Sequence, residues 1–103
     1  MAKKEKESIV IRDIFSHKQI RDNGDIIDIS IQEVKKSEDY PEGVRYSLVY
    51  VRDGKNLVRY DNYMGHGHHK HIGNRRKEYE FKDEWQLFSD FEEDLNKLNI
   101  RLD

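Results

Sequence analysis

The sequence predicts an α+β domain in which an antiparallel meander sheet of about five strands carries a C-terminal helix packed on one face. Two observations favour this fold: apolar residues alternate with polar ones in several runs separated by turn residues, and residues 84–103 carry one apolar stripe at helical spacing. The 103 residues suffice for one domain with a modest core. We expect residues 1–7 to form a disordered tail and residues 8–103 a single domain.

The first predicted hairpin joins a strand from Ser8 to about His17 with one that carries Ile27, Ile29 and Ile31 on a single face. Between them stands Asn23-Gly24, a dipeptide that favours a type I′ turn with two positive φ angles. His17 stands alone on its strand, and we expect it to have a structural role.

The next strand, from Val44 to Val51, is apolar on both faces, which predicts a central strand covered on both sides. Asp53-Gly54 predicts the second hairpin turn, and the chain returns along residues 57–63. A loop rich in glycine and histidine is expected at about 64–77, followed by a short strand around residues 79–81.

The helix is predicted from an apolar stripe at three- and four-residue steps. The stripe consists of Trp85, Phe88, Phe91, Leu95 and Leu98. Asp83 and Gln86 fit a capping box at the start of the helix. We assign Trp85, Phe88 and Phe91 to the core.

Composition excludes several classes of protein. The chain has no cysteine, which excludes a disulfide scaffold, thiolate metal sites and a cysteine nucleophile. No stretch approaches the ~18 apolar residues of a membrane span, and we expect a cytoplasmic protein.

The net charge of −2 is unevenly distributed: residues 65–77 contain four basic and no acidic residues, whereas residues 78–103 contain nine acidic and three basic ones. A local basic patch can bind anions whatever the total charge.

Four of the five histidines lie within residues 66–71. Imidazoles that titrate near neutrality can act as general base and general acid, and neutral imidazoles can also hold a divalent metal. In an extended segment His69 and His71 point to the same side, which makes them the natural pair.

Cations and one carboxylate accompany the histidines. Arg75, Arg76 and Lys77, together with Lys70, could form a phosphate cradle, although Arg76 and Lys77 fit equally well an ordinary solvated loop that neutralises the acidic helix. Arg59 and Asp61 share one face of their strand, as in a simple ion pair, but Asp61 could also orient an imidazole or supply a metal ligand.

Several segments stand in an order that resembles the TumE family of small prokaryotic toxins of toxin–antitoxin pairs. The specific part is Tyr60-Asp61-Asn62 followed by His68-His69-Lys70-His71-Ile72-Gly73, and the resemblance covers about residues 9–98. The signature positions carried over are Arg59, Tyr60, Asp61, Asn62, His68, His69, His71 and Gly73. The resemblance implies a protein encoded beside a DNA-binding antitoxin that restrains it.

The residues themselves favour a metal-independent endoribonuclease that cleaves RNA and inhibits translation. RNA supplies the nucleophile, so that the enzyme needs only a base, an acid and a cation. We assign catalysis to His69 and His71, in either order, with Asp61 and Arg75. The expected phosphate ligands are Lys70, Arg59, Arg76 and His68.

Two alternative functions remain open. His69, His71 and Asp61 could hold a divalent metal in a nuclease or phosphotransfer enzyme. The protein could instead bind RNA or a ribosomal surface without catalysis.

Two surfaces could bind protein partners. An antitoxin with basic residues could dock on the acidic helix at Glu92 and Glu93, and an edge strand could pair with a second copy to form a homo-oligomer.

Overall fold

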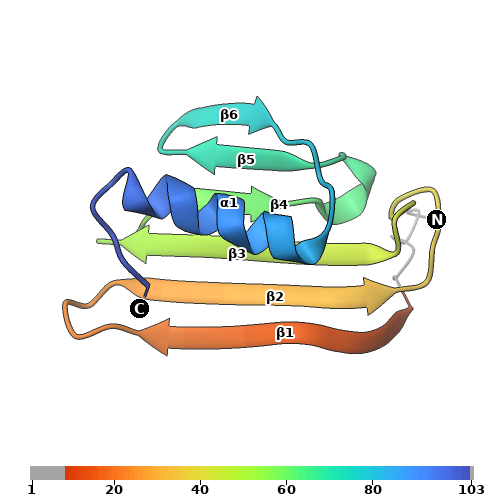
Figure 1. Ribbon diagram of the computed structural model, residues 1–103, viewed down its shortest axis with the longest axis horizontal. Coiled ribbons are helices and arrows are strands. Elements are labelled where there is room, and N and C mark those ends of the chain that lie inside the picture. The colour runs from red at the N-terminus through yellow and green to blue at the C-terminus, as the bar shows by residue number, and fades with distance from the viewer. Residues whose placement is uncertain (1–8, 103) are drawn as a thin grey trace, which may run out of the picture.

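The computed structural model describes residues 9–102, apart from the side chain of Met64, so that the predicted tail at residues 1–7 lies outside the described residues. The described chain forms one antiparallel meander sheet, in the strand order β1-β2-β3-β4-β5-β6, with a helix lying across it (Figure 1). This confirms the predicted α+β meander. The elements are β1 (Val10–Ile20), β2 (Ile26–Val34), β3 (Val44–Arg52), β4 (Lys55–Asp61), a 3₁₀ turn (Tyr63–Gly65), β5 (His69–Ile72), β6 (Arg75–Glu78) and α1 (Glu84–Asn96).

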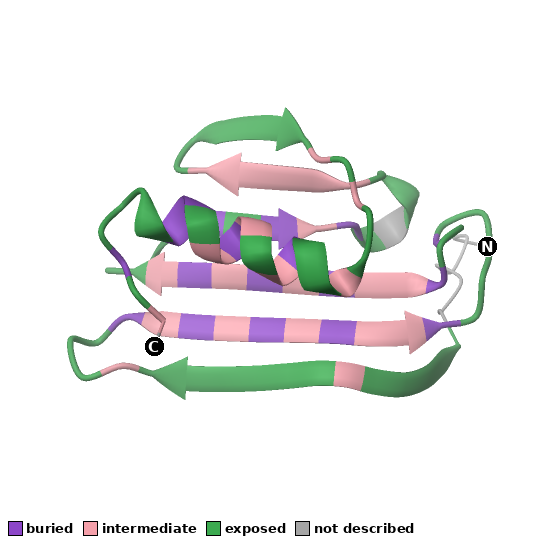
Figure 2. Cartoon of the chain, in the orientation of Figure 1, coloured by how far each residue is buried: buried purple, intermediate pink, exposed green. Residues whose placement is uncertain are grey.

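The core lies between α1 and the sheet face formed by β2, β3 and β4. Figure 2 shows buried residues alternating along β2 and β3, because successive side chains of a strand point to opposite faces. The fully buried side chains include Tyr46, Leu48, Tyr50, Val58, Tyr60, Leu87, Phe91 and Leu95. The second face of β3 is only half-buried, so the prediction of a strand covered twice is wrong. The single helix of the described chain covers one face of the sheet and leaves the other open.

The histidine-rich segment forms a hairpin rather than the predicted loop. β5 pairs with β4 and β6 with β5, while Gly73 takes a positive φ of 58° in the two-residue turn between them. Residues 79–81, predicted as a strand, instead connect this hairpin to α1. The sequence pattern did not reveal these strands because β5 and β6 are mostly polar. Backbone hydrogen bonds hold them in place, with β5 on the edge of β4 and β6 on the edge of β5.

The two tight turns of the sheet differ. Asp53 and Gly54 both have positive φ, as a type I′ hairpin requires. At the first hairpin only Gly24 has a positive φ, so the predicted type I′ turn at Asn23-Gly24 is wrong. The connection there is longer because Asp25 turns inward, where its backbone N–H donates to Asn23 Oδ1 at 2.9 Å and its carboxylate accepts from Tyr50 Oη at 2.6 Å.

The helix begins as predicted but is oriented differently. Asp83 caps it by accepting a hydrogen bond from the backbone N–H of Gln86 at 2.7 Å. Phe91 is fully buried and Phe88 partly so, but Trp85 is 81% exposed, and its assignment to the core is wrong. Leu87, Phe91 and Leu95 set the buried side, and Trp85 lies about 200° around the helix from Leu87.

The helix was predicted within residues 84–103, but α1 ends at Asn96. Asn99 has a positive φ of 62°, and the N–H groups of Asn99 and Ile100 donate to the carbonyls of Asn96 and Leu95. This is a Schellman arrangement, which terminates a helix. It returns Ile100 to the core and leaves Leu98 at the surface.

Candidate functional site

Two rows of polar side chains cross the sheet face opposite α1, at its β4–β6 end. Residues paired across neighbouring strands point to the same side of a sheet, so the register of the strands defines each row. One row is Arg59, His71 and Arg76, and the other is Asp61, His69 and Glu78. His71 therefore stands between two guanidinium groups and His69 between two carboxylates.

A shallow groove of about 390 Å³ lies over these rows, and we call it the imidazole groove. It is lined by Arg59, Asp61, Tyr63, His66, His69, His71 and Arg76. The structure thus brings His69 and His71 together with Asp61, Arg59 and Arg76. Tyr63 and His66, to which the sequence assigned no role, also line the groove, from the 3₁₀ turn and the residue after it. A hairpin predicted around Gly73 would have implied a short connection between β4 and β5.

The groove contains two close charged contacts. Arg59 Nε lies 2.7 Å from Asp61 Oδ2, and Arg76 Nη2 lies 2.7 Å from His69 Nε2. A guanidinium can only donate, so His69 Nε2 must be the acceptor and the ring is neutral, with its proton on Nδ1. Burial and, after it, the positive charge of Arg76 lower the pKa of His69. His69 is therefore an imidazole that can accept a proton near neutral pH once Arg76 releases Nε2.

Three of the predicted site residues lie on the helix side instead. Lys70 Nζ is 3.1 Å from Asp94 Oδ2 on α1. Arg75 is exposed and stands opposite Ile72 in the register, on the face that Val58 shares. Neither cation lines the imidazole groove.

His68, the third of these residues, packs against Tyr46, near the beginning of β3. Its ring is stacked on Phe81, with centroids 5.0 Å apart, and on Tyr46 at 5.7 Å. Nδ1 lies 2.8 Å from Tyr46 Oη, and Nε2 lies 3.0 Å from Glu42 Oε2. Both ring nitrogens thus have partners within the fold, on the face away from His69.

Two further signature residues belong to the packing of the fold. Asn62 is 3% exposed, and its side chain joins the ends of β3 and β4: Oδ1 accepts from the Tyr46 N–H at 2.9 Å, and Nδ2 donates to the Val44 carbonyl at 2.7 Å. The Tyr60 hydroxyl donates to the Asp94 carboxylate. Burial and this hydrogen bond raise the pKa of Tyr60, so the hydroxyl stays protonated.

The residues of the groove do not fit a metal site as they are arranged. In the described part of the chain, no three histidine, aspartate or glutamate side chains lie close enough to hold a metal ion together. The carboxylate of Asp61, the third member of the predicted ligand set, is held by Arg59. The groove instead offers three imidazoles and two guanidiniums, groups that acid–base chemistry on a phosphodiester can use.

Comparison with known proteins identifies the family. The family model described as "Toxin TumE" matches residues 3–99, a range that includes every residue of the imidazole groove. No curated protein and no solved structure matches the chain. Within residues 9–102, no helix has the length and apolar character needed to cross a membrane. The match extends over most of the chain, which therefore belongs to the TumE toxin family as the toxin component of a toxin–antitoxin pair.

Proposed function

We propose that this toxin is a metal-independent endoribonuclease that inhibits translation by cleaving RNA in the imidazole groove. The observation that carries the proposal is the pairing of a neutral imidazole, His69, with a second imidazole on the same strand face, His71, which two guanidiniums flank. Alternate residues of a strand lie roughly 7 Å apart, which lets the two rings reach opposite sides of one phosphate.

His69 acts as the general base. It takes the proton of an RNA 2′-hydroxyl, and the 2′-oxygen attacks the adjacent phosphorus. The bond from phosphorus to the 5′-oxygen breaks, and His71, as the general acid, gives a proton to that leaving oxygen. The products are a 2′,3′-cyclic phosphate and a free 5′-hydroxyl, so that atoms and charge balance without a metal or cofactor.

Arg59 and Arg76 stabilise the charge that develops on the phosphate oxygens. They lie on either side of His71 in the register, so a phosphate above this ring meets a guanidinium on each side. An incoming phosphate competes for Arg76, which frees His69 Nε2 to accept a proton. Asp61 holds Arg59 at 2.7 Å and fixes the direction of its guanidinium.

The test is cleavage of purified RNA in the presence of EDTA by the parent chain and by His69→Ala and His71→Ala. We expect each substitution to slow cleavage by about a hundredfold or more, since general acid and base groups contribute typically 10²–10⁴. Lys55→Ala removes an exposed cation of the β3–β4 hairpin and serves as the control with unchanged activity. Full activity of a folded double variant would contradict the proposal.

Two other outcomes would also contradict it. If chelation stops cleavage and a divalent ion restores it, the reaction depends on a metal. If the chain binds RNA in a salt-sensitive manner and yields no product, the groove is a binding surface only.

A further inference from the structure

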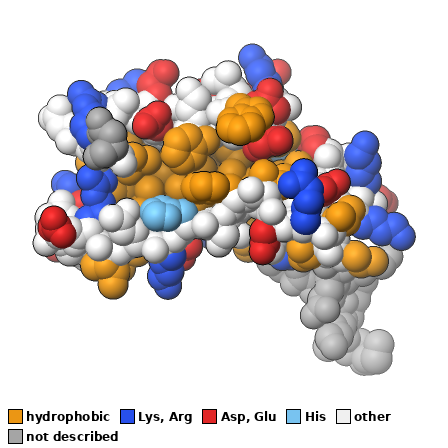
Figure 3. All heavy atoms as spheres, turned by 60° about the horizontal axis from the view of Figure 1, so that its bottom comes forward, with side chains coloured by type: hydrophobic (Ala, Val, Ile, Leu, Met, Phe, Trp, Pro, Cys, Tyr) orange, Lys and Arg blue, Asp and Glu red, His pale blue; other side chains and the backbone are white. Residues whose placement is uncertain are grey.

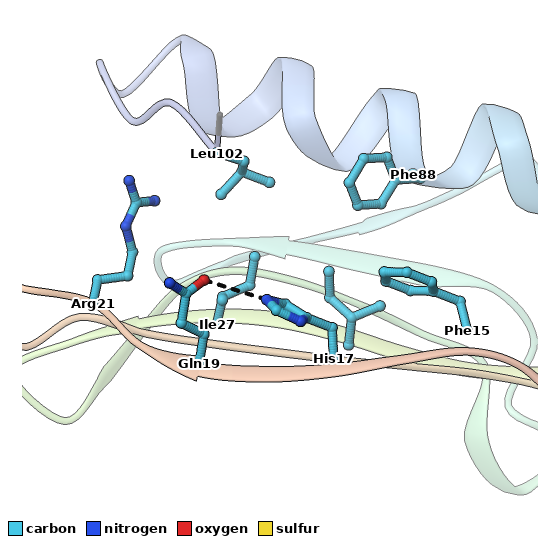
Figure 4. A pocket seen from close by; sticks show the side chains of 8 residues that line it. Phe15, His17, Gln19, Arg21, Ile27, Phe88 and Leu102 are labelled. Atoms are coloured by element: carbon cyan, nitrogen blue, oxygen red, sulfur yellow. Dashed lines mark hydrogen bonds between the residues drawn. The ribbon is translucent and has the colours of Figure 1, made fainter.

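A second groove lies on the helix side of the sheet, between β1 and α1, and we call it the β1–α1 groove (Figures 3 and 4). Its volume is about 370 Å³, within the usual range of binding pockets. It is lined by Phe15, His17, Gln19, Arg21, Ile27, Ile29, Phe88 and Leu102. In Figure 3 it forms an apolar hollow with polar borders.

The groove exists because one helix is too narrow for this sheet. A helix about 10 Å wide covers roughly two strands spaced 4.8 Å apart, and α1 lies over the middle of the sheet (Figure 1). Phe15, His17 and Gln19 stand opposite Ile31, Ile29 and Ile27 in the register, so they face the helix layer without lying under α1.

The part of the sheet over β1 that α1 leaves uncovered is apolar at the floor of the groove and along one of its walls. Phe15 remains 46% exposed, although its ring meets Phe88 edge-on at 6.3 Å. On the opposite side of α1 the uncovered strip, over β5 and β6, presents Lys70, Arg75 and Lys77 instead. An apolar partner therefore fits only the β1 side of the helix.

One end of the groove carries a guanidinium group, that of Arg21, in which one nitrogen lacks a hydrogen-bond acceptor. Arg21 Nη2 donates to the Arg101 carbonyl at 2.6 Å, and the guanidinium lies 5.7 Å from the centre of the Tyr50 ring. Arg21 Nη1 is buried and has no hydrogen-bond partner among the described residues. A buried donor without an acceptor is costly, by about 1–3 kcal/mol, and a carboxylate is the acceptor that best matches a guanidinium.

The free side of β1 adds to the same surface. β1 has eleven residues and pairs only with β2 in the described chain. Ile9, just before β1, and Val10 and Ile11, at its beginning, are exposed. A long edge strand with exposed apolar side chains is a surface that proteins normally cover.

We infer that the β1–α1 groove is a docking site for the antitoxin, and that its occupant is an amphipathic antitoxin segment. The segment lays apolar side chains on Phe15 and Phe88 and directs one carboxylate to the Arg21 guanidinium. This inference rests on membership of the toxin family and goes beyond the proposed ribonuclease activity. The groove lies on the opposite sheet face from the imidazole groove, so the two sites can be tested separately.

The first experiment measures by calorimetry the affinity of the full chain for the antitoxin encoded beside it. We expect Phe15→Ser and Arg21→Gln each to weaken binding by about tenfold or more, as expected of a central interface residue. Ile20→Ser is the matched control, because Ile20 is 72% exposed at the end of β1 and does not line the groove. It should change the affinity by less than about twofold.

Glu92→Lys/Glu93→Lys tests the alternative surface on α1. Under the inference it leaves the affinity unchanged. Strong weakening by this variant, with Phe15→Ser and Arg21→Gln binding like the parent, would overturn the inference and place the antitoxin on the acidic helix surface.

A second measurement tests the inferred docking site even if one of these variants fails to fold. A photo-crosslinking amino acid at Gln19, which lines the groove, should become covalently joined to an apolar, acid-bearing antitoxin segment. The same amino acid at Lys18, on the opposite face of β1, should not. Crosslinking from position 18 only would overturn the inference, as would a dimer of the chain alone that Phe15→Ser dissociates, since a second copy would then occupy the groove.

Discussion

Lys70 extends from β5 to the largely buried carboxylate of Asp94 on α1, with Nζ 3.1 Å from Oδ2. The same carboxylate accepts a hydrogen bond from the Tyr60 hydroxyl. Lys70 thus joins the helix to the outer part of the sheet, and its charge is turned away from the imidazole groove. The contact explains how a cation within the histidine motif can serve the fold.

We predict that Lys70→Met destabilises the fold by about 2 kcal/mol, because it removes a charge-assisted hydrogen bond from a nearly buried carboxylate. RNA cleavage by the folded variant should stay within about twofold of the parent, a difference of under 0.5 kcal/mol. Denaturant unfolding and the RNA assay check both parts. Arg75→Met removes an exposed cation from the same hairpin and should alter stability by less than about 0.5 kcal/mol.

The pH dependence of cleavage should follow His69. Its pKa lies below the ordinary value because of burial and, second, Arg76, so the neutral base forms as pH rises through that lowered pKa. Arg76→Ala removes the second cause only, and the rising limb of kcat/KM should therefore move to higher pH without fully reaching the ordinary value. NMR titration of the His69 ring measures the shift directly. A limb that stays in place, or moves to lower pH, would contradict the assignment of His69 as base.

Asp25 should make folding stability depend on acidity. A hydrogen bond from Arg52 is the largest cause that lowers its pKa to about 2, with bonds from Tyr50 and Asn23 contributing, although burial opposes them. A depressed carboxyl pKa stabilises the fold at pH values above the unfolded pKa, and this stabilisation is lost as pH falls towards 2.

Asp25→Asn should therefore lower the free energy of unfolding by about 2 kcal/mol at pH 7, and the difference from the parent should shrink between pH 4 and pH 2. Urea unfolding at several pH values measures it. Asp22→Asn, in the same turn but on an exposed side chain, is the control. A difference that is constant with pH would show that the carboxylate charge is not what matters.

Asn62 is expected to matter for stability rather than for catalysis. Asn62→Asp keeps the shape of the side chain but replaces the donor to the Val44 carbonyl with a buried acceptor. We expect a loss of about 3 kcal/mol or more, because a buried charge then faces a carbonyl oxygen. Thermal unfolding checks the size, and Asn56→Asp at an exposed position of β4 gives the baseline. Loss of cleavage in a variant of unchanged stability would instead place Asn62 in the reaction.

Periodicity sufficed for the elements that have a clear apolar pattern. The alternation of Ile27, Ile29 and Ile31 placed β2 with its buried face correct. The pairing of His69 with His71 followed from the period of a strand, and the structure sets both rings in one groove. β5 and β6 were not predicted because their strand character comes from pairing, of β5 with β4 and of β6 with β5, and their polar residues leave no periodic signal of it.

The sequence alone determined the meander, the position of the helix and the family, because each depends on local periodicity or on motif order. The tertiary structure decided which residues meet. It separated Lys70, His68 and Arg75 from the histidine pair, although they lie within six residues of it, since each one-residue step along a strand reverses the face to which a side chain points. It also left Trp85 in solvent, because three other residues of α1 fix the buried side of the helix.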